Sequence, residues 1–142
     1  MATEMVPRSA KGVLVEETQF CVGLEHKPGM LTRLCHLLRT EGVNIEALFV
    51  SNDADVAWVN FVAKPADRVE EALKKGRHKF FSESVLTVQV DNKPGEIEQI
   101  ATRLADADVN INYVYGSGAG GHPSIIVLSV DDPPKAAQAL KG

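Results

Sequence analysis

One short motif occurs twice in this chain, and the two copies lie a constant 66 residues apart. Each copy has Lys-Pro-Gly, then apolar residues at helical spacing, then Val-Asn-Ile. Lys27 matches Lys93 and Val43 matches Val109, with no gap between them. A repeat of fixed period constrains the fold more than any other sequence feature. Two copies are too few for a solenoid, so we expect a duplicated unit.

The chain length sets the scale of this unit. A chain of 142 residues forms one ordinary domain or two very small ones. Repeats this short are at the low end of independent stability, so each is expected to need the other. We expect a flexible tail at residues 1–10, a first repeat at 11–77 and a second repeat at 78–142.

Each copy begins with a strand followed by a helix. Residues 18–24 alternate in polarity, which is typical of a strand with one buried face. The apolar residues that follow recur at i, i+3, i+4 and i+7, as on one face of a helix. Gly42 ends the first helix, and Asp108 takes its place in the second copy, where it tolerates left-handed backbone. The expected stripes are Leu31, Leu34, Cys35 and Leu38, and then Ile97, Ile100, Ala101 and Leu104.

Two further strands and a second helix complete each copy. The expected strands are 43–51 and 56–63 in the first copy, and 109–115 and 124–130 in the second. The expected second helices are 65–75 and 134–141. The sixth element of the first copy is a strand at 78–82, but the second copy has no sequence left for it. We expect a strand at 11–16 to fill this edge, within the chain or from a neighbouring chain, because an open sheet edge is a liability.

The order strand-helix-strand-strand-helix-strand is the ferredoxin-like α+β pattern. With Lys-Pro-Gly before the first helix and Val-Asn-Ile at the next strand, both copies resemble the ACT domain, a small-molecule regulatory module. This resemblance implies two βαββαβ repeats whose antiparallel sheets pair side by side, with the helices on one face. It also implies an amino acid bound at the seam between the repeats.

The two Lys-Pro-Gly loops are the candidate binding sites. A helix N-terminus has unpaired N–H groups and the positive end of a dipole, which suit a carboxylate. Glycine allows close approach to that backbone, proline stiffens the loop, and asparagine both donates and accepts hydrogen bonds. The first loop comprises His26, Lys27, Pro28, Gly29, Met30 and Leu31. The second comprises Asn92, Lys93, Pro94, Gly95, Glu96 and Ile97.

The resemblance implies that each loop faces the strand that opens with Val-Asn-Ile in the other repeat. The Asn92 loop then pairs with Asn44 and Glu46, and the His26 loop with Asn110 and Asn112. Tyr113 is a further candidate at the edge of the seam, although Tyr113, Tyr115 and Trp58 are interpreted first as core residues. Asn92 supplies the amide often found in amino-acid-binding members, so its loop is favoured over the His26 loop.

Simpler interpretations of the same residues remain open. Pro-Gly can be just a tight connection between strand and helix, and asparagine can satisfy backbone groups at a strand start. The chain is then a protein interaction module without a small ligand. The Gly-rich run 116–121 lacks the Gly-Lys-Ser/Thr of a phosphate-binding loop and is expected to be a mobile hairpin tip. Cys35 and His36 are expected to be a core thiol beside a surface histidine, not metal ligands.

Composition and motifs also exclude several classes of function. A net charge of −4 and the lack of an RNA-recognition pattern argue against nucleic-acid binding. No nucleophile, base and orienting residue recur together, so we expect no enzyme and no cofactor. No segment is expected to enter a membrane or to act as a signal peptide. Cys21 and Cys35 are expected to be thiols of a cytoplasmic protein, and a homodimer and a protein partner are expected.

Overall fold

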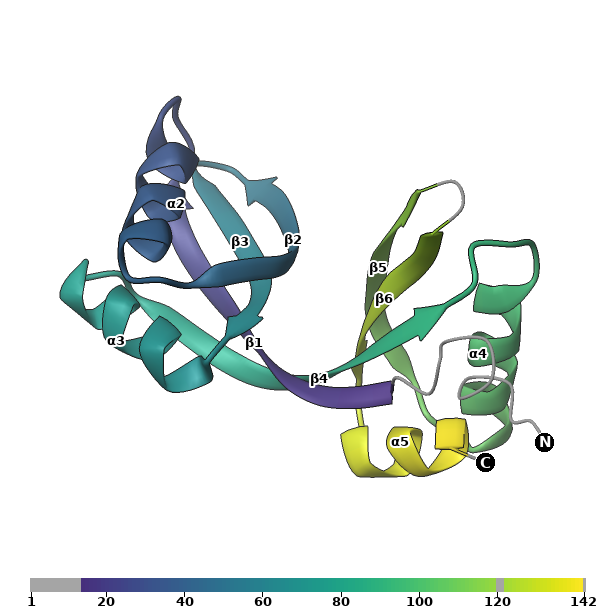
Figure 1. Cartoon of the computed structure of the whole chain (residues 1–142). Coiled ribbons are helices and arrows are strands. Elements are labelled where there is room, and N and C mark those ends of the chain that lie inside the picture. Colours follow the sequence, from purple (N-terminus) through teal and green to yellow (C-terminus); the bar gives the residue numbers. More distant parts are fainter. Residues whose placement is uncertain (1–13, 120–121, 142) are drawn as a thin grey trace. The chain divides into compact units, whose positions relative to one another are not determined.

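A computed structural model describes residues 14–119 and 122–141 of the chain (Figure 1). The expectations for residues 1–10 therefore lie outside the described residues. The elements are β1 (Leu14–Glu25), α2 (Met30–Thr40), β2 (Asn44–Asp53), β3 (Val56–Lys64), α3 (Ala66–Lys75), β4 (Phe80–Val90), α4 (Glu96–Asp106), β5 (Ile111–Ala119), β6 (His122–Val130) and α5 (Pro133–Lys141).

The chain divides into two compact units, and two of its strands contribute to both. One unit is Thr18–Glu83, and the other contains residues 14–17 and 84–141. The division falls within β1 and within β4. The hydrogen-bonded strand order is β2-β3-β1-β4-β6-β5. Each unit thus has four strands, and both have the ferredoxin-like order expected from the sequence.

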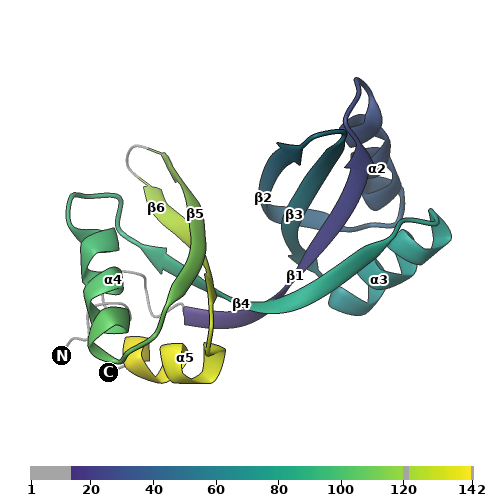
Figure 2. The same cartoon turned by 180° about the vertical axis from the view of Figure 1, so that it is seen from behind.

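The unit Thr18–Glu83 buries one face of its strands beneath two helices. Both α2 and α3 lie on the same face of the strands in Figure 1, and Figure 2 shows this arrangement from behind. Alternate residues of β1 enter this core, as their period-two pattern predicts. Residues Phe20 and Val22 of β1, Phe61 of β3, Leu34 of α2 and Leu73 of α3 are each no more than 1% exposed.

The other unit repeats this arrangement with α4 and α5. Its core includes Val88 of β4, Ile100 of α4, Leu128 of β6 and Leu140 of α5. Residues 14–17 of β1 lie in this unit, beside β4 in the strand order. The Thr87 hydroxyl donates hydrogen bonds to Glu17 Oε2 at 2.8 Å and to the Val15 carbonyl at 3.4 Å. Side chains therefore add to the backbone pairing of this short edge segment.

The helix ends follow the sequence prediction. Gly42 has a φ of 76° and Asp108 has a φ of 60°, so both copies use left-handed backbone after the first helix. The Val43 N–H bonds to the Leu38 carbonyl at 2.9 Å, and the Val109 N–H bonds to the Leu104 carbonyl at the same distance. A residue in this conformation lets the last helical carbonyls find partners.

The expected apolar stripes are partly wrong. Leu34, Leu38, Ile100 and Leu104 are buried, as predicted. Leu31 is 40% exposed, Ile97 is 54% exposed, and Cys35 is only half-buried. The residues just before Leu31 and Ile97 are buried in their place. Met30 packs against the core of its unit, and Glu96 is 4% exposed. The buried face of each helix is therefore rotated from the face that the i, i+4 spacing predicts.

The expectation that Tyr113 and Tyr115 face the core is also wrong. The β5 register shifts between Ile111 and Tyr113, so Tyr113 pairs with Ser129 and Tyr115 with Val127. The core residue Leu128 pairs with Val114 instead. A β-bulge puts two residues opposite one and reverses the faces of those that follow. The two tyrosine rings stack on each other with centroids 6.5 Å apart.

The Gly-rich run expected as a hairpin tip is mostly strand. β5 continues to Ala119 and β6 begins at His122, while residues 120 and 121 lie outside the described part. None of the described helices is long and apolar enough to cross a membrane.

Candidate functional site

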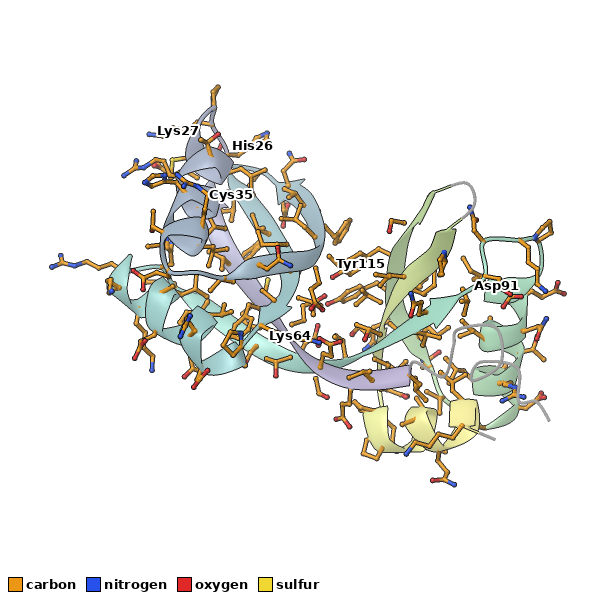
Figure 3. All side chains as sticks on the ribbon, viewed as in Figure 1. His26, Lys27, Cys35, Lys64, Asp91 and Tyr115 are labelled. Carbon is orange, nitrogen blue, oxygen red and sulfur yellow. The ribbon has the colours of Figure 1, made fainter. Side chains whose placement is uncertain are left out.

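The two Lys-Pro-Gly loops have nearly the same backbone. Gly29 has φ 92° and ψ −13°, and Gly95 has φ 93° and ψ −9°. Each glycine directly precedes a helix, α2 or α4. Figure 3 shows His26 and Lys27 in the loop before α2, and Asp91 where the chain leaves β4 for the second loop. The left-handed φ explains why this position is glycine in both copies.

The start of each helix presents backbone N–H donors. The residue before each helix is a glycine, so it makes no side-chain capping hydrogen bond. The first intrahelical hydrogen bonds run from the Arg33 N–H to the Gly29 carbonyl, at 3.1 Å, and from the Gln99 N–H to the Gly95 carbonyl, at 3.0 Å. The N–H groups of the preceding turn have no partner within an α-helix, and they lie at its positive end. A carboxylate is therefore a suitable ligand for either loop.

Free space surrounds both glycines. A Cβ built on Gly29 or on Gly95 would have no other heavy atom within 4 Å. Neither glycine is thus required by close packing, and its left-handed backbone is the constraint that the structure shows.

A pocket of about 350 Å³ lies beside the second loop and within its own unit. We call it the Asn92 pocket. Its polar lining comes from the Asn92 amide, from Ser117 and Ser124, and from Tyr115. Ile97, Val114, Gly116 and Ile126 complete it. Amide and hydroxyl groups on one side and aliphatic groups on the other suit a small ligand with a polar head and an apolar body.

Gly116 keeps the strand wall of this pocket thin. A Cβ at Gly116 would lie 2.7 Å from the Ile125 carbonyl oxygen and 2.7 Å from Ile126 Cδ1. These distances are too short for any side chain, and the carbonyl belongs to the backbone of the paired strand β6. Only glycine fits here without a shift of the strand. The first repeat has Val50 at the same place in its sequence.

Charge distinguishes the second loop from the first. Glu96 is 4% exposed at the start of α4, and its Oε2 lies 3.7 Å from the Lys93 amino group. A carboxylate at the N-terminus of a helix interacts favourably with the helix dipole. The first loop has the uncharged Met30 at this position, half-buried against its core.

The predicted partner residues in the strands lie at two equivalent β-bulges. The register shifts between Ile45 and Ala47, and again between Ile111 and Tyr113. The bulged residues are Glu46 and Asn112, and bulges often re-aim a side chain near a site. Both side chains are exposed, as are those of Asn44 and Asn110.

Polar contacts hold these bulges within their own units. Glu46 Oε2 lies 3.5 Å from the Lys64 amino group. Asn112 Nδ2 donates to Ser129 Oγ at 3.5 Å. The Asn110 N–H donates to Asp131 Oδ1 at 3.1 Å. Each pair of residues thus has a defined place in its unit, and the pairing of each loop with the other unit's strand stays a prediction.

The first loop has contacts of its own. The His26 N–H donates to the Asp55 carbonyl at 2.8 Å, which ties the loop to the β2–β3 turn. The Lys27 amino group lies 3.3 Å from Glu25 Oε1, with both side chains largely exposed. An exposed pair of this kind contributes about 0–1 kcal/mol, so Lys27 is readily available to a ligand.

Several residues of the Asn92 pocket were not predicted from the sequence. Tyr115, Ser117 and Ser124 come from β5 and β6, which the sequence interpretation treated as core or hairpin tip. Trp58 was also interpreted as a core residue, and this was wrong, because it is 36% exposed. The alternation along β3 could have shown this. Val59 and Phe61 are fully buried on one face of the strand, so the neighbouring Trp58 faces the other side.

The expectations for cysteine and metal concern other parts of the chain. Both Cys21 and Cys35 are free thiols. Burial raises the pKa of the Cys21 thiol, and the nearby Glu83 carboxylate adds to the effect. Among the described residues, no group of three or more His, Cys, Asp and Glu side chains is placed to hold a metal ion.

Comparison with solved structures gives relatives of known architecture. Protein BT0572 from Bacteroides thetaiotaomicron is 25% identical, with a TM-score of 0.83, over 90% of this chain and 88% of that one. The regulatory subunit of aspartate kinase from Thermus thermophilus, in a ligand-free form, is 12% identical, with a TM-score of 0.66, over 90% of this chain and 93% of that one. The corresponding subunit from Thermus flavus is 15% identical, with a TM-score of 0.63, over 90% of this chain and 93% of that one.

The aspartate kinase subunits share the fold of this chain, and they are regulatory rather than catalytic subunits. A comparison with curated protein sequences gave no match. The family model described as "ACT domain pair" matches residues 15–141, which is nearly the whole chain. With two loops and two bulges at equivalent places in two ferredoxin-like units, the chain belongs to the ACT domain pair family.

Proposed function

We propose that this protein is a non-catalytic regulator that binds an amino acid at its Lys-Pro-Gly loops. The observation that carries the proposal is the Asn92 pocket of about 350 Å³ beside the glycine that begins α4. The N-terminus of α4 provides N–H donors for a carboxylate. The aliphatic lining from Ile97 and Val114 would take an apolar side chain.

The residues predicted from the other repeat complete this proposal. Asn44 and Glu46 would close the ligand over the Asn92 loop, and Asn110 and Asn112 would do the same over the His26 loop. The ligand would then contact groups from both repeats and stabilise one arrangement of them. A ligand can shift such an equilibrium only by its difference in affinity for the two arrangements. A protein partner would read that change.

Assembly and location are also part of the proposal. The functional repeats would be residues 11–77 and 78–142, with the strand at 14–17 in the unit of the second repeat. The protein would act in the cytoplasm as a homodimer. Size-exclusion chromatography with light scattering, with and without the amino acid, measures the oligomeric state directly.

A thermal-shift screen of the common amino acids tests ligand binding. A ligand that binds only the folded state raises the free energy of unfolding by about 2.7 kcal/mol at a free concentration of 100 times its Kd. We expect a rise in melting temperature with at least one amino acid. No rise with any of them at millimolar concentration would exclude the regulator hypothesis in this form.

Variants then locate the site. Asn92→Ala should abolish the rise caused by the amino acid, while His26→Ala reports on the first loop. Asn52→Ala is the matched control, because Asn52 is an exposed amide at the far end of β2. A rise that persists in both loop variants would place the ligand elsewhere.

The alternative is an interaction module that binds no small ligand. Two exposed apolar side chains support it, Leu31 at 40% and Ile97 at 54% exposure, at equivalent places on α2 and α4. If the screen gives no rise but Leu31→Ser together with Ile97→Ser changes the oligomeric state, the module is the better description.

A further inference from the structure

Each unit has one strand whose outer edge is open. β2 and β5 stand at the two ends of the hydrogen-bonded strand order, and among the described strands each pairs with a single neighbour, β3 or β6. Beyond its bulge, β2 stays in regular register over residues 47–53 and β5 over 113–117. An edge strand presents unpaired backbone groups, and lysine or proline often protects it from pairing with another chain. Neither strand contains a lysine or a proline.

The apolar core of each unit continues to this open edge. Leu48 of β2 pairs with the core residue Phe61, and Val114 of β5 pairs with the core residue Leu128. Directly paired residues of antiparallel strands lie on the same face of the sheet. Leu48 and Val114 nevertheless remain 39% and 43% exposed, at equivalent positions of the two repeats. Apolar side chains that extend a core into solvent are typical of a surface that another protein covers.

The first helix of each unit borders the same edge. Ile97 of α4 and Val114 of β5 line the Asn92 pocket together. Their equivalents in the first repeat are Leu31 of α2 and Leu48 of β2, and both are also exposed. A partner at either edge would therefore meet a strand and a helix at once.

The two helices differ in charge and in size on their outward side. The side chains of α2 that line a hollow of about 450 Å³ are Leu31, Thr32, Cys35, His36 and Arg39. The equivalent residues of α4 are Ile97, Glu98, Ala101, Thr102 and Ala105. One helix thus has a cation and larger side chains here, and the other has an anion and two alanines.

Arg39 and Glu98 have no ion-pair partner among the residues that the structure describes. Arg39 is exposed in the last turn of α2, where its Nη2 lies 3.1 Å from Nδ1 of His36. Glu98 is exposed in the first turn of α4. Each charge interacts favourably with the dipole of its own helix. An antiparallel contact between the two helices would bring these opposite charges together.

We propose that α2 and β2 of one copy dock against α4 and β5 of a second copy. The inference rests on the homodimer of the proposed function and identifies the surfaces that meet in it. The units share one topology, so antiparallel pairing of their equivalent edges relates them by a pseudo-twofold axis, and α2 runs antiparallel to α4 of the other copy. Both helices have 11 residues, and their midpoints, Cys35 and Ala101, meet at this axis. Arg39 then lies opposite the first turn of α4, beside Glu98.

Contacts between like surfaces lack this complementarity. Two copies of α2 would place Arg39 opposite Thr32. Two copies of α4 would place Glu98 opposite Ala105, so both charges would stay unpaired. Unlike surfaces give one pair of opposite charges at each seam. Since every chain has both surfaces, two copies form two identical seams, and no open edge is left for a third copy.

The same seam completes the proposed amino-acid site. Antiparallel pairing puts the start of β2, with Asn44 and Glu46, beside the end of β5 in the second copy. Ser117 near that end lines the Asn92 pocket. The residues that close the ligand over the Asn92 loop therefore come from the other copy.

Thiol crosslinking tests which surfaces meet. Ala101→Cys and the wild type are treated with 1,2-bis(maleimido)ethane, which joins two nearby thiols, and the products are analysed by denaturing electrophoresis and peptide mass spectrometry. Cysteine already occupies the equivalent position of α2, so the variant should fold normally. We expect Ala101→Cys to give dimers linked between position 101 and Cys35 of the other copy, and the wild type to give none. Cys21 is buried and should not react.

Three results of this experiment would overturn the proposal. A link between the Cys35 residues of two wild-type chains would mean that like surfaces meet. A link from position 101 to Cys35 within one chain, found in the monomer band, would mean that no second copy is needed. The absence of any link in Ala101→Cys would mean that the two helices do not approach each other.

Charge reversal provides a second measurement. Arg39→Glu and Glu98→Arg should each weaken self-association on the order of tenfold, because a repulsive pair replaces an attractive one at both seams. The double variant restores opposite charges and should recover most of the affinity. Glu71→Arg, at an exposed position of α3, is the matched control and should leave the affinity unchanged. Analytical ultracentrifugation measures the dissociation constants, and a double variant as weak as the single ones would refute the Arg39–Glu98 contact.

These measurements are independent of the amino-acid screen, because they contain no ligand. A dimer with the expected crosslink but without any thermal shift would support this inference and reject the amino-acid site. A thermal shift in a protein that stays monomeric by ultracentrifugation would do the reverse.

Discussion

The two Lys-Pro-Gly loops share a backbone and differ in chemistry. Gly29 and Gly95 have φ angles of 92° and 93° before helices of equal length. The next residue is Met30 in one loop and a buried Glu96 in the other. Duplication has therefore kept the conformation that presents a helix N-terminus while the charge beside it has changed. If the loops bind the proposed amino acid, the glycine would supply the shared backbone and its neighbour would influence which ligand each loop prefers.

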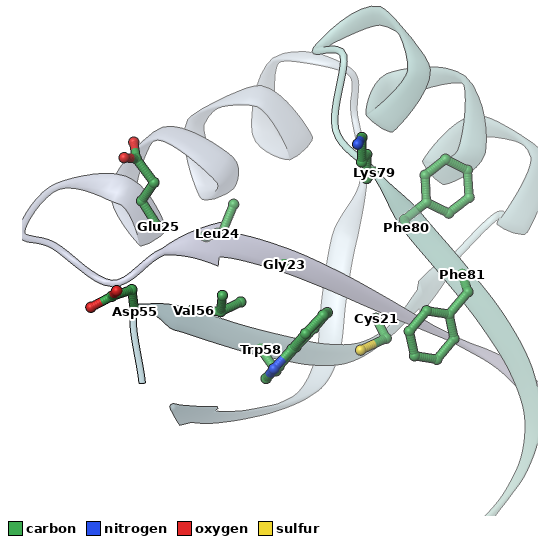
Figure 4. A pocket seen from close by; sticks show the side chains of 10 residues that line it. All are labelled: Cys21, Gly23, Leu24, Glu25, Asp55, Val56, Trp58, Lys79, Phe80 and Phe81. Atoms are coloured by element: carbon green, nitrogen blue, oxygen red, sulfur yellow. The ribbon is translucent and has the colours of Figure 1, made fainter. Parts of the chain in front are cut away.

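The walls beside the loops differ in the same way. Gly116 lines the Asn92 pocket, and the first repeat has Val50 at the equivalent position. The first repeat instead has a hollow of about 580 Å³ whose lining includes Gly23, Trp58 and Phe81 (Figure 4). Two units with one topology thus have differently lined hollows. Five predictions test how far the equivalence extends, beginning with the largest effect.

Core substitutions at equivalent helix positions should cost the same in both units. Leu34→Ala and Ile100→Ala each remove a side chain that is 1% exposed, and we expect a loss of about 2–5 kcal/mol in the free energy of unfolding. Urea denaturation measures both losses. Leu31→Ala and Ile97→Ala are the controls and should change stability by no more than about 0.5 kcal/mol. A large loss in these exposed variants would contradict the observed rotation of the buried face.

The Gly116→Val substitution should reveal a difference in packing between the two repeats. The new side chain would meet the β6 backbone at Ile125, so we expect a loss of about 1–3 kcal/mol from overpacking. It should also remove any thermal shift that depends on the Asn92 pocket. Val50→Ala in the first repeat is the reference change, with a smaller loss because Val50 is 39% exposed. Normal stability of Gly116→Val would mean that β5 can move away from β6 at little cost.

Alanine at the loop glycines should show that the backbones are equivalent. Gly29→Ala and Gly95→Ala each place a Cβ on left-handed backbone with no neighbour within 4 Å, so strain alone should cost about 1–2 kcal/mol. Thermal and urea denaturation should give equal losses within error. Gly29→Asn and Gly95→Asn should lose less, because asparagine tolerates this conformation. Unequal losses would show that the loops differ in more than side chains.

Removing the Glu96 charge should have a smaller effect. Glu96→Gln loses the favourable interaction with the α4 dipole and with Lys93, at a cost of about 0.3–1 kcal/mol. Met30→Leu, which leaves the first loop uncharged, should stay within about 0.5 kcal/mol. Denaturation in low and high salt would show the electrostatic origin, since screening should reduce the loss in Glu96→Gln. A gain in stability on losing the charge would refute this account.

The smallest effect is a pH dependence that comes from His78 in the unit Thr18–Glu83. Burial lowers the pKa of His78, and the Arg33 charge lowers it further. The unfolded chain, with a pKa of about 6.5, then binds the proton more readily than the folded protein. The stability contribution is thus complete above about pH 6.5 and declines as the pH falls toward the folded-state pKa. His78→Gln should flatten the profile of urea midpoints between about pH 7 and pH 5 relative to the wild type.

The features that were predicted correctly depend on local chemistry. Pro-Gly before a helix, and Gly42 or Asp108 after it, each determine a few backbone angles, and the structure has them. The burial of Leu34 and Leu38 followed from helical spacing in the same way. Local rules of this kind do not need the rest of the fold.

The features that were missed depend on the three-dimensional arrangement of the strands and helices. The bulge after Ile111 reverses the face of the sheet on which Tyr113 lies. The prediction missed this because a period-two pattern assumes an uninterrupted strand pairing. Leu31 matches the helical spacing but lies beyond the edge of the buried face, and spacing does not reveal that edge. The close approach of Trp58 to Gly23 needs these residues of two strands to lie opposite each other, and this register exists only in the folded sheet.

The division of β1 and β4 between the units also has a consequence for biosynthesis. The unit Thr18–Glu83 is one continuous stretch, so all its residues are available soon after residue 83 is made. The other unit needs residues 14–17 as well as the late helix Pro133–Lys141, so it must wait for nearly the whole chain. Domains fold as they emerge from the ribosome, the N-terminal ones first. Once the early unit has folded, its two hydrogen-bonded strands β1 and β4 continue into residues 14–17 and 84–90. These segments supply the first two strands of the second unit's sheet while the other two strands are still being translated.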